Sequence, residues 1–324
     1  MRMRTTNRIN RAGANGVDME TRQVVLADAF ADEPLGGLPV AVVPDGDSLA
    51  DGRLRRIATE FGATGAVALR DGAMTYVARK EGDRGDEADG AVAGAVAGGA
   101  ALIERGHVDT GTHTMAVDGA APDGSAPAEL DLEIEQDRRV GVPLSEQPDQ
   151  STVPTADIAA ALGIDVAALD DVGADLPAAR TEGYGGTLLV PVNFLEHLSR
   201  ADPAADDLAP LLAAVEATRL CAFTFDTLGT ETDLHARFFR PGVEECERPA
   251  SGVAAGACGA HLSRHAVFDG DRESIRIECG RFLDRPGTVV TTLNEQPRVG
   301  GSALTVLDGD LTLPPDDDDG IIEV

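Results

Sequence analysis

Residues 234–256 read LHARFFRPGVEECERPASGVAAG, and this stretch decides the fold. It contains an apolar strand (234–239), an acidic loop (242–248) and a glycine, Gly252, that opens a segment of Ala, Val and Gly. Residues 74–94, MTYVARKEGDRGDEADGAVAG, repeat the same order, with the acidic loop at 80–89 and the glycine at Gly90. The two glycines lie 162 residues apart, half of the chain length. The sequence therefore predicts two similarly built halves.

Each glycine is expected to open a helix made almost wholly of small residues. Such residues are poor choices for an exposed helix, and glycine inside one costs about 1 kcal/mol relative to alanine. They suit a helix that is surrounded on all sides, where a sheet must approach closely. We therefore expect an α+β fold of two pseudo-symmetric halves, each a curved sheet wrapped around a central helix, with a cleft between the halves. Chance similarity of two Ala/Gly-rich segments is the alternative.

The remaining periodicity places further elements around these two helices. Leu54, Ile57 and Phe61 form one apolar stripe, which predicts a helix near 50–61 with Ser48 as its cap. Other predicted helices lie at 157–161 and 208–218. Predicted strands lie at 23–29, 39–43, 65–69, 73–79, 114–118, 129–135, 187–192, 220–226, 234–239, 274–279, 287–292 and 303–307.

The domain division that follows has two halves and three connecting or terminal segments. The halves are 21–142 and 155–313, and the last strands can return to the first half. A Ser/Gln/Pro/Asp-rich linker is expected at 143–154, a disordered extension at 1–20 and an acidic tail at 314–324.

Composition limits the class of protein. The chain has 324 residues, 56 acidic and 27 basic, with a formal net charge of −29 and a single lysine, Lys80. An acidic surface that uses arginine instead of lysine suits molar salt, which screens self-repulsion, so we expect a halophilic protein. The charge argues against nucleic-acid and membrane partners. The four cysteines fit no zinc site, and we expect free thiols and a cytoplasmic location.

A small carboxylate is the expected ligand. The N-terminus of a helix attracts anions through its free N–H groups and its dipole, and two such ends would flank one cleft. The predicted ligand-binding residues are the two helix starts with an added arginine, namely Gly90, Ala91, Ser251, Gly252, Val253 and Arg248. Arg248 can instead pair with Glu244, Glu245 or Glu247 in its own loop.

Four segments resemble the phenazine-biosynthesis PhzF-like isomerase family, within the diaminopimelate-epimerase-like fold. They are Asp28–Phe30 with Pro34–Val43, Leu234–Phe239 with Pro241, Glu247–Gly252, and Arg298–Ala303 with Leu304–Leu313. The likeness covers about residues 22–313. The resemblance implies two hotdog-like domains, often a homodimer, and isomerisation of small acidic metabolites by proton transfer without cofactor or metal.

The residues that would transfer the proton differ from those of the family. The resemblance places the family's glutamate on Gly65, its histidine on Ala91 and its aspartate on Arg248. Glycine and alanine carry no titratable group, and arginine stays protonated at any working pH. The sequence therefore predicts a relative whose standard activity is lost or altered.

Several alternatives remain open. An active, cofactor-independent isomerase could use a relocated carboxylate, Glu60 or Glu247. A non-catalytic interaction or regulatory protein is a third hypothesis. Thiol chemistry at Cys246 or Cys258 is disfavoured, because neither cysteine lies at a predicted start of a central helix. His261 and His265 share one helix face but lack an evident third ligand, so we expect no metal.

Overall fold

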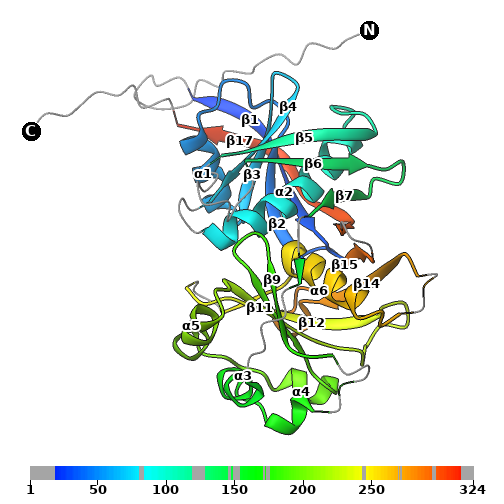
Figure 1. Cartoon of the computed structure of the whole chain (residues 1–324). Coiled ribbons are helices and arrows are strands. Elements are labelled where there is room, and N and C mark those ends of the chain that lie inside the picture. The colour runs from blue at the N-terminus through cyan, green and yellow to red at the C-terminus, as the bar shows by residue number, and fades with distance from the viewer. Residues whose placement is uncertain are drawn as a thin grey trace, which may run out of the picture.

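The computed structural model describes residues 19–314, except 80–83, 119–127, 145–146, 149–153, 171, 173–175, 243–245, 269, 271 and 294–296. The predicted extension at 1–20 lies almost entirely outside the described residues, as does the acidic tail after Pro314. The described chain forms two lobes that meet along a central contact, with α2 and α6 close to it (Figure 1).

The first lobe contains the N-terminal elements. They are β1 (Glu20–Ala29), β2 (Leu38–Val43), α1 (Asp51–Glu60), β3 (Gly65–Arg70), β4 (Ala73–Ala78), α2 (Arg84–Glu104), β5 (Gly111–Asp118), β6 (Glu129–Ile134) and β7 (Val140–Pro143).

The second lobe follows in chain order. Its elements are β8 (Gln147–Pro148), α3 (Thr155–Leu162), β9 (Ala179–Glu182), β10 (Thr187–Pro191), α4 (Leu195–Ser199), α5 (Ala205–Ala214), β11 (Arg219–Thr224), β12 (Leu234–Phe239), β13 (Glu247–Arg248), α6 (Gly252–Arg264), β14 (Ser274–Cys279), β15 (Gly287–Thr292) and β16 (Arg298–Gly301). The last strand, β17 (Ala303–Leu313), returns to the first lobe and pairs with β1.

Strand pairing follows the same order in both lobes. In the first, β2 pairs parallel to β3, β3 antiparallel to β4, β4 parallel to β5 and β5 antiparallel to β6. In the second, β10, β11, β12, β14 and β15 pair in the same sequence of directions. Antiparallel pairing of β7 with β16 links the lobes. The architecture is therefore a sheet-dominated α+β fold.

Each lobe holds one buried helix of small residues, as the sequence predicts. All residues of α6 from Gly252 to Leu262 are buried. A Cβ atom added at Gly259 would lie 2.6 Å from Thr291 Oγ1, and one added at Gly94 of α2 would lie 2.5 Å from Tyr76 Cδ2. Both distances are too short for a real Cβ contact, so glycine is required where the sheet approaches the helix.

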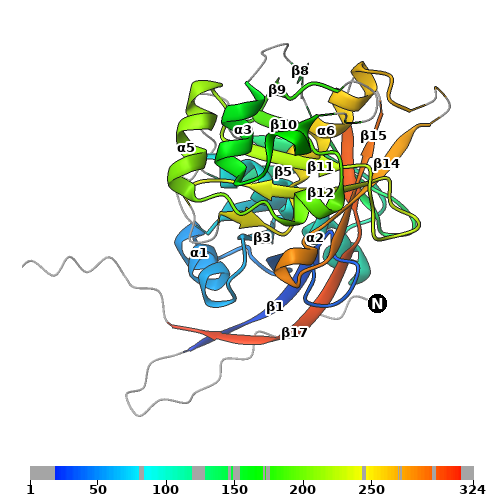
Figure 2. The ribbon, with the colours of Figure 1, turned by 90° about the horizontal axis from the view of Figure 1, so that it is seen from below.

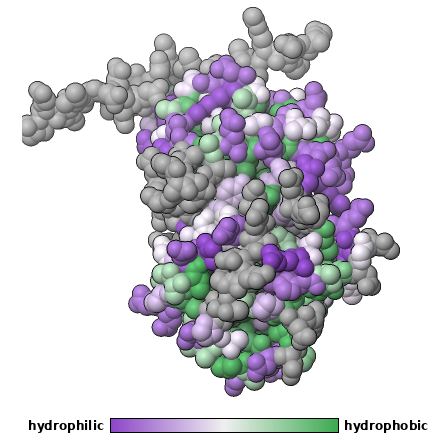
Figure 3. All heavy atoms as spheres, viewed as in Figure 1, coloured by the Kyte–Doolittle hydropathy of each residue, from purple (hydrophilic) through white to green (hydrophobic). Residues whose placement is uncertain are grey.

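A continuous apolar core surrounds both central helices and crosses from one lobe to the other. Two smaller clusters lie outside it, one between α1 and the sheet of the first lobe and one among α3, α5 and the second-lobe strands. Figure 2 shows α3 and α5 on the outer side of the second lobe. Hydrophilic residues are spread over both lobes on the face seen in Figure 3. Within the described residues, no helix is both long and apolar enough to cross a membrane.

Two predictions about helix starts are wrong. Helix α2 begins at Arg84, six residues before Gly90, so Gly90 lies inside the helix and does not open it. Helix α1 begins at Asp51 after Ala50, which makes no side-chain cap. The hydroxyl of Ser48, predicted as that cap, instead accepts a hydrogen bond from Arg22.

Candidate functional site

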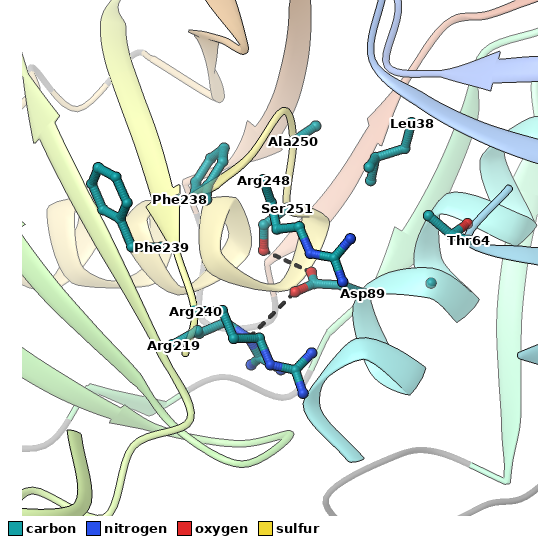
Figure 4. Close-up of a pocket in the computed structure, with 11 residues that line it drawn as sticks. Leu38, Thr64, Asp89, Arg219, Phe238, Phe239, Arg240, Arg248, Ala250 and Ser251 are labelled. Carbon is teal, nitrogen blue, oxygen red and sulfur yellow. Dashed lines mark hydrogen bonds and ion pairs between the residues drawn. The ribbon is translucent and has the colours of Figure 1, made fainter. Parts of the chain in front are cut away.

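A pocket lies where the two lobes meet, at the start of α6 (Figure 4). It is lined by Leu38, Thr64, Asp89 and Gly90 from the first lobe and by Arg219, Phe238, Phe239, Arg240, Arg248, Ala250 and Ser251 from the second. The space that a water-sized sphere can enter measures only about 10 Å³. A cavity of that size holds about one water molecule, so side chains nearly fill the pocket.

The start of α6, which the sequence predicts at Gly252, is capped by the serine that precedes it. Ser251 is the N-cap residue, with extended backbone angles, and its hydroxyl accepts a hydrogen bond from the Ala254 N–H at 3.0 Å. A serine hydroxyl at this position satisfies one of the helix's free N–H groups. The Val253 N–H, another of these groups, points toward the first lobe.

A carboxylate from the other lobe occupies this N-terminus. Asp89 Oδ1 accepts hydrogen bonds from Ser251 Oγ at 2.7 Å and from the Val253 N–H at 3.1 Å. Asp89 Oδ2 forms an ion pair with Arg219 Nε at 3.3 Å. Arg219 is only 3% exposed, so this pair is shielded from solvent. We call Ser251 Oγ, the Val253 N–H and Arg219 the carboxylate cradle.

Helix α2 starts earlier than the sequence predicts, and this places Gly90 and Ala91 inside the helix. Because α2 begins at Arg84, Gly90 and Ala91 lie in its second turn, where their N–H groups bond to carbonyls one turn back. They therefore differ from the free N–H groups that the sequence analysis expects at the first helix start. Asp89 also lies in the second turn of α2, and its carboxylate meets the start of α6, where the helix dipole and the donors favour a negative charge.

A tyrosine fills the space beside Gly65, the position on which the resemblance places the family's glutamate. Tyr76 is fully buried, and its hydroxyl donates to the Thr64 carbonyl at 3.2 Å. A Cβ atom at Gly65 would lie 2.4 Å from Tyr76 Oη, and one at Gly90 would lie 2.1 Å from the same atom. A glutamate at Gly65 therefore cannot be accommodated unless the tyrosine ring moves.

The predicted binding residues all lie at or beside the pocket. Gly90, Ser251 and Arg248 line it, and the side chain of Arg248 points toward Asp89 (Figure 4). Ala91, Gly252 and Val253 are buried behind this lining. A Cβ atom at Gly252 would lie 2.5 Å from Val92 Cγ1, so the two central helices touch at this point.

The sequence analysis misses four residues of this site: Asp89, Arg219, Arg240 and Tyr76. One signal was present, because Asp89 precedes Gly90 as Ser251 precedes Gly252, with the same spacing of 162 residues. Extending the internal repeat back by one residue would have placed Asp89 at a helix-cap position. The two arginines carry no such signal, since each belongs to a strand or strand end that an apolar pattern defines.

The two glutamates considered as relocated acid/base residues, Glu247 and Glu60, do not line the pocket between the lobes. Glu247 binds Arg237, with 2.9 Å between Oε1 and Nε and a second contact between Oε2 and Nη2. Glu60 is exposed and lines a different surface pocket together with Arg53 and Arg56. Among the described residues that line the pocket between the lobes, neither glutamate is present.

The other nucleophilic and titratable groups are also away from the pocket. Cys258 is buried inside α6, and Cys246 lies half-buried next to the outer cluster of the second lobe. Burial is the main cause that lowers the pKa of His235, although Glu278 Oε1, 2.8 Å from its Nδ1, acts in the opposite direction. Glu278 also accepts hydrogen bonds from the Leu228 and Gly229 N–H groups. This buried pair therefore fixes the loop before β12.

No group of three potential metal ligands among His, Cys, Asp and Glu occurs in the described part of the chain. His261 and His265 contact each other edge to face, with their ring centroids 4.7 Å apart. The ring pair is a packing contact within and just after α6.

The family model described as phenazine biosynthesis-like protein, PhzC-PhzF, matches residues 87–309. The match spans more than half of the chain, and the chain therefore belongs to this family.

Individual relatives agree with the family assignment. The chain is 27% identical over 281 residues to the uncharacterised isomerase YfhB of Bacillus subtilis, covering 86% of this chain and 92% of YfhB. It is 29% identical over 321 residues to an uncharacterised isomerase of Mesorhizobium japonicum, covering 90% and 99% of the two chains. The fold is similar to that of a Bacillus anthracis phenazine biosynthesis protein of the PhzF family, with a TM-score of 0.75 at 23% identity over 91% of this chain and 100% of that one.

Proposed function

We propose that this chain binds a small carboxylate metabolite between its lobes and lacks the standard proton-transfer chemistry of its isomerase family. One observation carries the proposal: the cradle at the start of α6 holds a carboxylate, that of Asp89. A hydroxyl, a backbone N–H and a guanidinium converge on it, and these donors match the acceptors of an ionised acid group. The same donors suit the acid group of a ligand.

The proposed loss of chemistry rests on the residues at the family's acid/base positions. Gly65 and Ala91 carry no proton, and the Arg248 guanidinium stays protonated. General acid/base catalysis contributes about 10²–10⁴ in rate, so its loss should reduce an isomerisation by at least that factor. Tyr76 supports this reading, because its ring occupies the space that a side chain at Gly65 would need.

The finer architecture belongs to the same proposal. The matching order of strand pairs supports two pseudo-symmetric, hotdog-like halves with the ligand site between them. Assembly as a homodimer, a cytoplasmic location and adaptation to high salt complete the proposed picture, and light scattering in molar salt would test the first of these.

The experiment is proton exchange in heavy water at high salt. The full chain would be incubated with chiral α-hydroxy and α-amino acids, including malate and glutamate, and deuterium at carbon followed by NMR. We expect binding, seen as a ligand-dependent rise in Tm, and no deuterium incorporation above the uncatalysed rate. Incorporation that disappears in Glu247→Gln or Glu60→Gln would identify an active isomerase with relocated carboxylates and overturn the proposed loss of activity.

A non-catalytic interaction protein is the second candidate, and the small pocket volume favours it. A chain of this class would bind none of the acids at any salt concentration and would keep its fold when the cradle is altered. The same Tm series separates the two candidates.

A further inference from the structure

The contacts of Asp89 are unusual for a residue of the first lobe. Asp89 belongs to α2, yet its contacts with Ser251, Val253 and Arg219 all reach into the second lobe. Both of its oxygens are engaged, Oδ1 by two donors and Oδ2 by the guanidinium. The side chain therefore makes the set of contacts that a free acid group would make in this cradle.

We propose that Asp89 is a built-in occupant of the carboxylate cradle, so that the acid group of a ligand binds there only when Asp89 leaves. This inference rests on the function proposed above and adds a regulatory device to that site. Asp89 acts as an intramolecular competitor, and the resting protein binds external carboxylates more weakly than it would without Asp89.

The donors of the cradle are already used by Asp89. A ligand must therefore compete with Asp89 for them and cannot bind together with it. The Ala254 N–H donates to Ser251 Oγ, and the Ser251 hydroxyl in turn donates its proton to Asp89. The Val253 N–H also donates to Asp89. A hydroxyl has one proton and a backbone amide has one hydrogen, so neither donor can fully serve a second carboxylate at the same time.

The remaining space leads to the same conclusion. The cavity beside Asp89 measures about 10 Å³, which accommodates about one water molecule. A carboxylate with even one attached carbon needs more room than this. Removal of the Asp89 carboxyl group would supply the space and would free the Ser251 hydroxyl and the Val253 N–H as donors.

Tethering makes the internal competitor strong. A group held on the same chain acts at an effective concentration on the order of millimolar or higher. If Asp89 occupies the cradle in about 90–99% of molecules, the observed affinity for an external carboxylate falls about 10- to 100-fold. Removal of Asp89 should therefore raise the affinity for an external carboxylate by the same factor.

The test is chemical rescue of the full-length protein. Asp89→Ala, which retains good helix propensity, would be compared with the wild type and with Asp118→Ala. Asp118 is a matched control, since it also pairs with an arginine, Arg55 at 2.6 Å, but lies at the end of β5 outside the pocket lining. The probes are sodium formate and sodium acetate against sodium chloride at equal ionic strength, with Tm and isothermal titration as readouts.

We expect Asp89→Ala to have a lower Tm that formate and acetate restore, with an affinity for formate at least about tenfold higher than that of the wild type. The wild type and Asp118→Ala should respond to formate no more than to chloride. Equal formate binding by wild type and Asp89→Ala would overturn the proposal. Adding Ser251→Ala to Asp89→Ala should weaken formate binding, and unchanged binding would place the anion outside the cradle and also overturn it.

If Asp89→Ala does not fold, Asp89→Asn keeps the shape of the side chain and removes its charge. Its amide competes less well for Arg219, so formate should bind more tightly than to the wild type, and equal binding would count against the proposal.

The two proposals fail differently. Malate or glutamate binding equally well to wild type and Asp89→Ala would overturn occupancy and keep the proposed function. Formate rescue without binding of any larger acid would keep occupancy and overturn the proposed function.

Discussion

The starts of the two central helices, α2 and α6, differ although the sequence around them repeats. Helix α6 begins at its glycine, Gly252, with a serine cap and N–H groups that meet a carboxylate. Helix α2 begins six residues before its glycine, Gly90, and spans 21 residues against 13 for α6. The start of α6 thus forms the carboxylate cradle, and a residue inside α2, Asp89, supplies the carboxylate.

The surroundings of the two starts differ in the same sense. The space beside Gly90 is filled by the ring of Tyr76, and the first lobe lines the pocket with Leu38, Thr64 and Asp89. The second-lobe side carries the arginines and the polar cap. The two helix regions therefore contribute different groups to the pocket, a carboxylate from α2 and its donors from α6 and β11.

The largest expected effect comes from removing the ring that fills the space beside Gly90 in the first lobe. Tyr76→Ala removes a fully buried ring and should lower the free energy of unfolding by about 3–5 kcal/mol, because the helix and sheet cannot close the cavity completely. Urea denaturation in molar salt measures this. Tyr76→Phe is the control, since it keeps the ring and loses the hydrogen bond from the hydroxyl to the Thr64 carbonyl, about 0.5–1.5 kcal/mol. A cost below about 1 kcal/mol for Tyr76→Ala would mean that the ring does not support the helix.

The second comparison uses a histidine that only α6 has. His261 matches Gly99 of α2 at the same spacing, and it is fully buried. Burial, followed by the charge of His265, lowers the pKa of His261 from 6.5 to about 4. Between these pH values the unfolded chain binds a proton that the folded chain does not. The free energy of unfolding should therefore fall by about 1.4 kcal/mol for each unit that the pH decreases in this window.

His261→Gln checks this prediction in the same denaturation series. Between pH 6.5 and 4, the free energy of unfolding of the variant should depend less steeply on pH than that of the wild type. The contribution of His261 is absent, while the other titrating groups still contribute to the slope. An unchanged slope would show that His261 is protonated in the folded protein and that its burial does not control its charge.

The smallest expected effect concerns the packing of Gly90 against Tyr76. Gly90→Ala places a Cβ atom 2.1 Å from Tyr76 Oη, which forces a shift and should cost about 1–3 kcal/mol despite the better helix propensity of alanine. In a Tyr76→Phe background the hydroxyl is absent, and the same substitution should cost at least about 1 kcal/mol less. Equal costs in both backgrounds would contradict the close packing of helix and ring.

Much of the fold could be predicted from the sequence because the decisive signals are local. The strand at 234–239 coincides with β12, and Gly252 does open α6 after a serine cap. The strands at 39–43, 65–69 and 129–135 lie within one residue of β2, β3 and β6 at each end. Apolar runs bounded by turn residues define these elements without reference to the rest of the chain.

The predicted residues Gly90, Arg248 and Ser251 line the pocket between the lobes, and their role in ligand binding stays a prediction. The contacts of Asp89 and Tyr76 could not be predicted from the sequence. Asp89 looked like one more member of an acidic loop, and Tyr76 like an ordinary strand residue. Their roles depend on contacts with residues far away in the chain, 162 positions away for Asp89 and Ser251.

Two glycine-rich runs of small residues predict two buried central helices, since glycine inside a helix is unfavourable unless a neighbouring element must approach closely. The sequence by itself also determined that Gly65, Ala91 and Arg248 cannot move a proton. Only the tertiary structure decided where α2 begins and what binds the start of α6. A helix end is set by whichever partners satisfy its free N–H groups, and here the partner is a carboxylate that the fold brings from the opposite lobe.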